Sequence, residues 1–432
     1  MRILSADWVV PVEGAPIRDG AVAIEDGRIS AVGTVSELGE GERYPEAVIL
    51  PGFVNAHSHL EYAVYGGFGD GLSFAPWILI HMERKARIGV EEMEAIARAG
   101  ALECLESGIT TVGDCSFGGA AAAACAELGL RAIVYLEVFG RDAAALDGRF
   151  GQLRERVEPH LSSRVRLGIS PHAPYTCAPE LYAACLALEE LPVATHLNES
   201  RDELEWLVNG TGPWESFAAQ LPPPIGETGI RALARRDLLS PRMLAAHCVK
   251  VDDEEIALLA EHDVPVAHCP RSNAVLGCGV APLAELRAAG LRVGLGTDSP
   301  ASTPSFDMFD EMRTALYAAR AREERPDALS TTDVLELATL GSAGALGLAD
   351  EIGTLTPGKQ ADVCIVSLAD SPFLPWEDPV TAAVLGGAPE RVVATLVAGE
   401  TRYEKGGKTW PELTADARSA RSRLLSRAAA TS

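Results

Sequence analysis

The sequence predicts an α/β fold in which a closed (β/α)8 barrel carries a small β-sandwich domain made from both ends of the chain. Apolar runs alternate with Ala-, Leu- and Glu-rich helical stretches through the middle of the chain. These runs are continuous rather than alternating, which is typical of parallel strands covered by helices on both faces. Eight such units favour a closed barrel, and a doubly wound open sheet is the structural alternative.

The barrel strands are expected where the apolar runs lie, and helices are expected between them, for example at 91–107 and 252–262. Segment 209–229 is rich in glycine and proline and follows a strand, so we expect a long loop over the mouth of the barrel. The predicted strands are 48–56, 109–115, 131–139, 165–170, 192–197, 243–249, 264–269 and 292–298.

Both ends of the chain have a different pattern. Two short alternating runs flank Asp26-Gly27, which predicts a hairpin. Residues 353–405 also contain short strands and turns. We therefore predict a composite β domain from residues 1–50 and 350–410, a barrel over residues 51–349, and a helical tail over residues 411–432.

The charge of the chain limits its partners. Among 432 residues, 61 are acidic and 37 are basic, so the net charge is −24. This charge disfavours nucleic acid and anionic membranes as partners. The sequence has no secretory signal and no apolar run of about 18 residues, the length that would span a bilayer. The nine cysteines include no CxxC pair, so we expect a cytoplasmic protein without a disulfide framework.

Four candidate metal ligands lie at predicted strand ends. His57 and His59 are two residues apart, so their side chains share one face of a strand. His196 ends the fifth strand and Asp298 ends the eighth. Strand ends of a barrel converge at its carboxyl-terminal mouth. Three imidazoles and one carboxylate suit a divalent ion, with zinc preferred and iron or manganese as alternatives. The fourth strand has no lysine to bridge two metals, so we predict a single ion.

Further polar residues lie at the same predicted rim. Glu199 follows His196 by three residues and could carry protons. His247 ends the sixth strand and could polarise the attacked centre or hold a water. His172 ends the fourth strand and is expected to contact substrate. We expect His268 to be structural, and we expect the remaining histidines to be solvated or packed: His81, His160 and His262.

Several motifs together resemble the amidohydrolase superfamily, and within it the mononuclear deaminase and chlorohydrolase branch. The motifs are PGFVNAHSH at 51–59, SPHAPYT at 170–176, THLNES at 195–200, AHCV at 246–249, HCPRSN at 268–273, GTDSPAS at 296–302 and GTLTPGKQADVCIV at 353–366.

The resemblance implies a TIM barrel with one divalent ion on His57, His59, His196 and Asp298. It implies that hydroxide on the metal attacks a ring carbon bearing an amino group. Glu199 would protonate the adjacent ring nitrogen, and Asp298 would accept the water proton as ammonia leaves. His247 would stabilise or orient the reacting groups.

The resemblance also narrows the substrate, a small molecule. The segments HSHLE at 57–61, ESRDELEWL at 199–207, GTGPW at 210–214 and HCPRSN resemble the deaminases of 6-aminodeoxyfutalosine, a menaquinone precursor. Enzymes for S-adenosylhomocysteine usually have a lysine where this chain has SNAVLG. Deaminases of S-adenosylhomocysteine, methylthioadenosine, adenosine or guanine, and triazine or chloro-hydrolases, are the alternatives.

The carboxyphenyl group of 6-aminodeoxyfutalosine requires a cation. Arg271 is the first candidate, followed by Arg141 and Arg201. The sequence is compatible with a homodimer. Three residues after the first barrel strand could also line the pocket, and the sequence does not rank them. Those residues are Glu61, Trp77 and Glu83.

Overall fold

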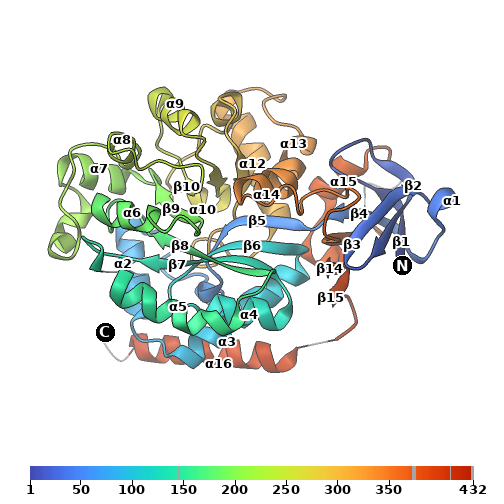
Figure 1. Cartoon of the computed structure of the whole chain (residues 1–432), viewed down its shortest axis with the longest axis horizontal. Coiled ribbons are helices and arrows are strands. Elements are labelled where there is room, and N and C mark those ends of the chain that lie inside the picture. Colours follow the sequence, from blue (N-terminus) through green and yellow to red (C-terminus); the bar gives the residue numbers. More distant parts are fainter. Residues whose placement is uncertain (145, 372–375, 409, 430–432) are drawn as a thin grey trace.

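Two β-sheets organise the chain. In the computed structural model they are an eight-stranded parallel sheet and a seven-stranded mixed sheet, described over residues 1–144, 146–371, 376–408 and 410–429. The parallel sheet lies at the centre of the larger lobe, and the mixed sheet forms the smaller lobe, where strands from the two ends of the chain lie side by side (Figure 1).

The parallel sheet is the predicted barrel. Its strands are hydrogen-bonded in chain order, so each strand lies beside the next along the sequence. This order and direction confirm the (β/α)8 architecture. The strands are β5 (Phe53–Ser58), β6 (Ile109–Ser116), β7 (Arg131–Val138), β8 (Val165–Pro171), β9 (Val193–Leu197), β10 (Met243–His247), β11 (Val266–His268) and β12 (Val293–Leu295).

The last strand returns to the first and closes the barrel. Ser58 and Asp298 form a parallel bridge, and the backbone N–H of Asp298 donates to the carbonyl of His57 at 3.0 Å. The buried amide of Asn55 donates to the Thr297 hydroxyl at 2.7 Å and accepts from the Thr297 backbone N–H at 3.0 Å. The sheet is therefore closed and not doubly wound.

Helices surround the barrel and cover the outer faces of its strands (Figure 1). The apolar residues of most of these helices join the strands in one large core, whereas Phe74, Trp77, Trp206 and Leu207 belong to a second cluster. In chain order the helices are α2 (Phe74–Lys85), α3 (Val90–Glu106), α4 (Ala120–Leu128), α5 (Gly151–Val157), α6 (Pro179–Leu186), α7 (Arg201–Asn209), α8 (Gly229–Ala234), α9 (Asp253–Glu261), α10 (Pro270–Val275), α11 (Leu283–Ala288), α12 (Met308–Glu323), α13 (Thr331–Glu336) and α14 (Ser342–Ala345).

The mixed sheet combines both ends of the chain in the order β15-β14-β13-β4-β1-β2-β3. Asp26 and Gly27 have φ of 49° and 76°, as a tight hairpin turn between β2 and β3 requires. The bounds are β1 (Arg2–Val9), β2 (Ile17–Glu25), β3 (Arg28–Thr34), β4 (Glu42–Pro51), β13 (Val363–Ser367), β14 (Val392–Val397) and β15 (Glu400–Glu404), with α1 (Val35–Leu38) and α15 (Pro379–Gly386) beside them.

The predicted strand 48–56 is two strands in the structure. β4 ends at Pro51 in the mixed sheet, and β5 begins at Phe53 in the barrel. Between them, a side chain at Gly52 would come within 2.2 Å of the Thr110 side chain. The close approach of this backbone to β6 therefore requires glycine at the point where the chain passes from one sheet to the other.

The last helix, α16 (Pro411–Ala429), runs along the outside of the barrel beside α3 (Figure 1). Arg421 on α16 donates to the carbonyls of Val64 and Gly66, in the segment that follows β5. Arg423 pairs with Glu92 on α3 at 2.6 Å. The tail thus fixes the segment that leaves the first barrel strand.

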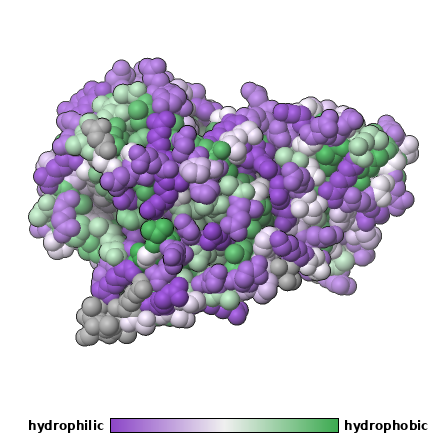
Figure 2. Space-filling model, turned by 60° about the horizontal axis from the view of Figure 1, so that its bottom comes forward, coloured by the Kyte–Doolittle hydropathy of each residue, from purple (hydrophilic) through white to green (hydrophobic). Residues whose placement is uncertain are grey.

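Hydrophilic side chains cover most of the face shown in Figure 2, and apolar residues form small separate patches there. Within the described residues, no helix is long and apolar enough to cross a bilayer. All nine cysteines are free and buried.

Candidate active site

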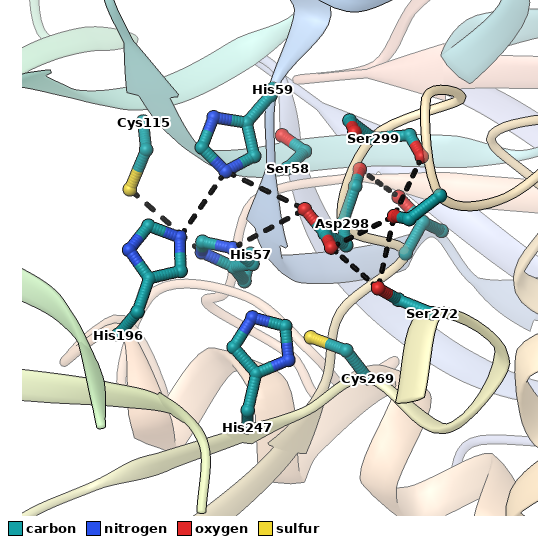
Figure 3. A network of polar contacts seen from close by, with 12 residues as sticks. His57, Ser58, His59, Cys115, His196, His247, Cys269, Ser272, Asp298 and Ser299 are labelled. Atoms are coloured by element: carbon teal, nitrogen blue, oxygen red, sulfur yellow. Dashed lines mark hydrogen bonds and ion pairs between the residues drawn. The ribbon is translucent and has the colours of Figure 1, made fainter. Parts of the chain in front are cut away.

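Five polar side chains converge at the carboxyl-terminal ends of the barrel strands. They are His57 on β5, His59 directly after it, His196 on β9, His247 on β10 and Asp298 just after β12. All five are buried, and their side chains point toward one another (Figure 3). The structure therefore brings together the predicted ligand residues, which lie as much as 241 positions apart in the sequence.

The ligand atoms are close enough to share one ion. The nearest ligand nitrogens of His57, His59 and His196 all lie within 4.8 Å of one another. Oδ1 of Asp298 lies 3.7 Å from Nε2 of His57 and 3.5 Å from Nε2 of His59. Nε2 of His59 and Nε2 of His196 are 3.4 Å apart.

The lone pairs of this cluster fit a divalent ion. Nε2 of His57 is buried and has no hydrogen-bond partner among the described residues. Nδ1 of His196 lies 2.6 Å from the carbonyl of His172, a contact that places the ring proton on Nδ1 and leaves Nε2 free as a ligand. Oδ2 of Asp298 accepts from Ser272 and Ser302 at 2.6 and 2.9 Å, so Oδ1 faces the histidines.

The electrostatics keep the cluster in the form that binds metal. Burial lowers the pKa of His57 and His59 well below the usual value and lowers the pKa of His196 to about 4, so the rings are neutral at pH 7. Burial alone would raise the pKa of Asp298, but His247, His57 and the Ser272 hydroxyl outweigh it and hold that pKa below its usual value. Neutral imidazoles and an ionised carboxylate are the species that ligate zinc.

The backbone at the rim is strained. Asn198, His247 and Asp298 have φ of 49°, 73° and 55°, in a region that residues other than glycine rarely adopt. Such strain persists where surrounding structure fixes it, and it occurs often at functional sites. Here Asn198 directly follows β9, His247 ends β10, and Asp298 lies three residues after β12.

Glu199 and His247 form a second group beside the first. Oε2 of Glu199 lies 3.7 Å from Nε2 of His247, and Nδ1 of His247 lies 3.0 Å from Oδ1 of Asn273. Burial raises the pKa of Glu199 well above its usual value, and the charges of Asp298 and Glu203 add to this effect. Glu203 accepts from the backbone N–H of Glu199 at 2.7 Å and holds this segment in place.

A cavity of about 470 Å³ opens onto both groups. Its wall is mainly aromatic, and Trp214 and Phe217 come from the segment 209–229 that the sequence predicts over the mouth. Tyr175 lies 5.0 Å from Trp214, measured between ring centroids. Flat aromatic walls around a few polar groups are typical of a pocket for a planar ligand.

Of the residues predicted to contact the substrate, some line the cavity and others do not. His172 lines the cavity. The structure corrects the prediction that Arg271 binds the substrate. Its guanidinium is buried and donates to the carbonyls of Ser305 and Asp307 at 3.2 and 3.1 Å, so these hydrogen bonds are made inside the protein. It is absent from the described cavity lining.

Arg141 and Arg201 also lie away from the cavity. Arg141 is exposed and donates to the carbonyl of Leu221 at 2.6 Å. Arg201 is exposed at the start of α7. Neither belongs to the described residues of the cavity wall. The arginine clamp expected for a substrate carboxylate is therefore not supported at these positions.

Of the residues the sequence left unranked, Trp77 lines the cavity. Glu61 is used structurally, since it accepts from the Ser116 hydroxyl at 2.6 Å and from the backbone N–H of Gly118 and Ala120, both at 2.8 Å. Glu83 is largely exposed and pairs with Arg87. His268 is buried beside the site but is not part of the described lining.

The cavity wall also contains a glutamate, a histidine and a lysine that the sequence did not assign to the pocket. Glu137 lies one residue before the end of the apolar strand β7, close to the kind of position that identified the histidines. His81 was expected to be solvated or packed, and it is buried against the cavity. Lys85 lies on α2, where nothing in the helical pattern distinguishes it from a surface lysine.

Comparisons with known proteins agree with this arrangement. The family model described as "Amidohydrolase family" matches residues 48–403. A 5′-deoxyadenosine deaminase from Methanothermobacter thermautotrophicus is 33% identical over 409 residues, covering 91% of this chain and 92% of that protein. A 5-methylthioadenosine/S-adenosylhomocysteine deaminase from Desulforudis audaxviator is 36% identical over 382 residues, covering 84% and 85%.

Among solved structures, an adenosine deaminase from Xanthomonas campestris with bound zinc has a TM-score of 0.88 to this chain. It is 29% identical, and the match covers 98% of both chains. The similarity thus extends over the barrel and the mixed sheet together.

Proposed function

The chain belongs to the amidohydrolase family and is a hydrolase that acts on carbon–nitrogen bonds, and from this premise we propose that it deaminates an aminopurine nucleoside in a metal-dependent reaction. The observation that carries the proposal is the pair of buried carboxylates. Glu199 has a raised pKa and Asp298 a lowered one, and their carboxylates and the His247 ring each have an atom within 4.8 Å of the others. Two carboxylates with opposite shifts supply an acid and a base in one site.

We propose that His57, His59, His196 and Asp298 hold a zinc ion. The donor set, its neutral rings and the unpartnered Nε2 of His57 support this assignment, as does the zinc in the adenosine deaminase from Xanthomonas campestris. Such an ion supplies a strong hydroxide nucleophile at neutral pH.

The residues of the chain then move the protons. Asp298 is ionised and accepts a proton from the attacking water. Glu199 carries its proton at neutral pH and donates it to the ring nitrogen beside the attacked carbon. The carbon–oxygen bond forms and the carbon–nitrogen bond then breaks, with the proton held by Asp298 passing to the amine, which leaves as ammonia. The proton from Glu199 stays on the ring nitrogen of the product, and the remaining proton of the water returns to Glu199. General acid–base catalysis of this kind contributes about 10²–10⁴-fold in rate.

His247 orients the reacting groups in this scheme. Its Nδ1 proton is used in the contact with Oδ1 of Asn273, and burial lowers the pKa of the ring. The neutral ring therefore presents the lone pair of Nε2 to the centre, 3.7 Å from Glu199. It can accept a hydrogen bond from water or from the protonated Glu199.

Within this class we propose 6-aminodeoxyfutalosine as the substrate, which would place the enzyme in menaquinone biosynthesis. The sequence motifs that resemble this group of deaminases support the proposal, and the aromatic wall suits a phenyl substituent. Methylthioadenosine or S-adenosylhomocysteine is the second candidate, favoured by the relative from Desulforudis audaxviator. All of these compounds have an aminopurine and a ribose in common.

A substrate panel tests the proposal. Ammonia release would be measured with 6-aminodeoxyfutalosine, methylthioadenosine, S-adenosylhomocysteine, 5′-deoxyadenosine, guanine and a chlorotriazine. We expect turnover of the nucleosides, with the highest kcat/KM for 6-aminodeoxyfutalosine. Turnover of guanine or the chlorotriazine alone would overturn the nucleoside assignment. A preference for another nucleoside would overturn only the finer choice.

A further inference from the structure

One carboxylate in the cavity wall has an oxygen that makes no hydrogen bond to any described residue. Glu137 lies one residue before the end of β7, lines the cavity and is only 2% exposed. Its Oε2 has no hydrogen bond among the described residues. A buried carboxylate that lacks hydrogen bonds is costly, and native proteins rarely leave such a group unsatisfied without a functional reason.

A cation lies beside this carboxylate. Lys85 ends α2 and lines the same cavity, with its ammonium 3.7 Å from the centre of the Phe117 ring and 5.7 Å from that of Phe139. The guanidinium of Arg149 is 4.0 Å from the same Phe117 ring. This part of the wall therefore combines one carboxylate and one ammonium with aromatic faces, while Arg149 is outside the described lining and donates to the carbonyls of Glu137 and Phe117.

The mixed charges limit what can bind there. A cationic group would be repelled by Lys85, and an anionic group would be repelled by Glu137. A neutral group with several hydroxyls can use both charges, because a carboxylate accepts two hydrogen bonds and an ammonium donates. Vicinal hydroxyls match the two oxygens of a carboxylate, and acidic side chains bind ribose hydroxyls in this way elsewhere.

The wall is also near the reacting centre. The charge of Lys85 is among the influences that lower the pKa of His59 and His172, and both histidines face the same cavity. In a nucleoside held at Glu199 and Asp298 by its purine, the next group along the molecule is the sugar. The sugar is thus the part of the substrate that this wall would meet.

Resting on the proposed nucleoside deaminase activity, we propose that Glu137 binds the ribose of the substrate by accepting hydrogen bonds from its vicinal hydroxyls, with Lys85 supporting the ionised carboxylate. This assigns a role in specificity to two residues outside the metal cluster. It predicts that the enzyme requires the hydroxyls and not only the purine.

The first test compares adenosine with 2′,3′-dideoxyadenosine on the wild-type enzyme, by ammonia release. We expect kcat/KM to be about 100-fold lower for the dideoxy compound, because a site built to bind a hydroxyl is left with an unpaired polar group. In Glu137→Gln this ratio should fall below about 10, because the amide offers one acceptor oxygen and no charge. The matched control is Glu83→Gln on α2, an exposed glutamate, which should keep the ratio of the wild type.

The outcomes separate the two proposals. No ammonia from any aminopurine nucleoside would overturn the proposed function, and the sugar site with it. Ammonia from both compounds at similar kcat/KM, or an unchanged ratio in Glu137→Gln, would overturn the sugar site alone. If Glu137→Gln fails to fold by circular dichroism, calorimetry on the wild type replaces it: inosine should bind at least tenfold more tightly than 2′,3′-dideoxyinosine. Equal binding would overturn the proposal.

Lys85 is a positioning residue in this account, and a pH profile tests it. Burial raises the pKa of Glu137 to about 7, Lys85 and Arg149 oppose this rise, and Glu61 and Asp298 add to it. Lys85→Met should raise that pKa further, so the preference for adenosine should weaken at pH 7 and recover toward pH 9. A preference in Lys85→Met that is equally weak at both pH values would show that Lys85 does not act through the charge of Glu137.

Discussion

Glu199 and Asp298 show how one site can hold an acid and a base of the same chemical type. Both carboxylates are buried, yet Glu199 faces other carboxylates, while Asp298 faces imidazoles and two hydroxyls. The environment, and not the kind of residue, separates their pKa values. At the residue scale, the proposed chemistry depends on this separation.

Glu199→Gln tests the proposed acid. The amide keeps the shape of the side chain but cannot deliver a proton, so kcat for the nucleoside substrate should fall by about 10²–10⁴-fold. The metal content should stay at the wild-type level, because Glu199 is not among the proposed ligands. Glu190→Gln, at an exposed glutamate in the turn before β9, serves as the control. A variant that loses its metal together with its activity would argue that Glu199 is a ligand.

His57→Ala tests the proposed ligand set. Removing one of three imidazoles should lower the zinc content and the deaminase activity together. Both are measured on the same sample, by elemental analysis and by ammonia release. His160→Ala, in the short turn Glu158–His160 that follows α5, should change neither. Full activity in a His57→Ala protein that is free of metal would contradict the assignment.

The substrate arginines show the limit of sequence reasoning at this scale. Arg271 follows a strand end, as a contact residue should, but its partners Ser305 and Asp307 lie more than 30 residues further along the chain. Nothing in the local pattern reveals that these carbonyls occupy its guanidinium. The histidines and Asp298 were placed correctly because their position depends only on the strand ends, and their roles as ligands stay a prediction.

At the scale of the elements, the junction between β5 and β12 holds the site together. It closes the barrel and also sets His57 against Asp298, whose backbone N–H donates to the carbonyl of His57 at 3.0 Å. A side chain at Gly296 would come within 2.8 Å of the His57 Cβ. The two strands must therefore approach closely for the ligands to meet.

Asn55→Ala tests this junction. Asn55 is fully buried and makes two hydrogen bonds to Thr297. Its removal leaves the buried backbone N–H of Thr297 without a partner and the Thr297 hydroxyl with only its bond to the Asp298 carbonyl, so the free energy of unfolding should fall by about 2–4 kcal/mol. Urea denaturation measures this change, with Asn209→Ala at an exposed position as the control. A loss no larger than that of the control would mean that these hydrogen bonds do not hold the barrel closed.

The elements were predicted well where one apolar run makes one strand. The prediction of one strand over 48–56 was wrong because both halves of this run are apolar and buried, although they belong to different sheets. Only Gly52 marks the break. Glycine is required there because the backbone passes close to Thr110, which is a tertiary contact. A pattern of hydrophobicity cannot show such a contact.

At the scale of the molecule, one buried ion pair joins the barrel to the loops of the mixed sheet. Arg131 at the start of β7 donates to Asp362, with Nε 3.0 Å from Oδ2. Both side chains are at most 5% exposed. Asp362 also accepts from the backbone N–H of Ala398 at 2.7 Å. The pair therefore links segments that come from three distant parts of the chain.

Asp362→Ala should destabilise the whole protein by about 3–5 kcal/mol, because it leaves the buried charge of Arg131 unpaired. Thermal and urea unfolding would measure the loss. Glu127→Ala removes a partner of Arg98 in a more exposed pair and should cost less than about 1 kcal/mol. Equal effects of the two variants would contradict the structural importance of the buried pair.

The architecture of the molecule was predictable for a physical reason. Parallel strands covered on both faces must be apolar throughout, and eight of them in chain order close into a barrel. The confirmed fold follows from that repeat and from the short alternating strands at both ends. The substrate pocket was less predictable, because Lys85 and Glu137 come from different elements and meet only in the folded chain.

The central claim, metal-dependent deamination of an aminopurine nucleoside, is tested most directly by measuring ammonia release from such nucleosides. The measurement compares the wild type, the protein stripped of metal, and the stripped protein after zinc is restored. The account predicts turnover in the first, its loss in the second and its recovery in the third. Undiminished turnover in the stripped protein, or no ammonia from any nucleoside by the zinc-loaded enzyme, would contradict it.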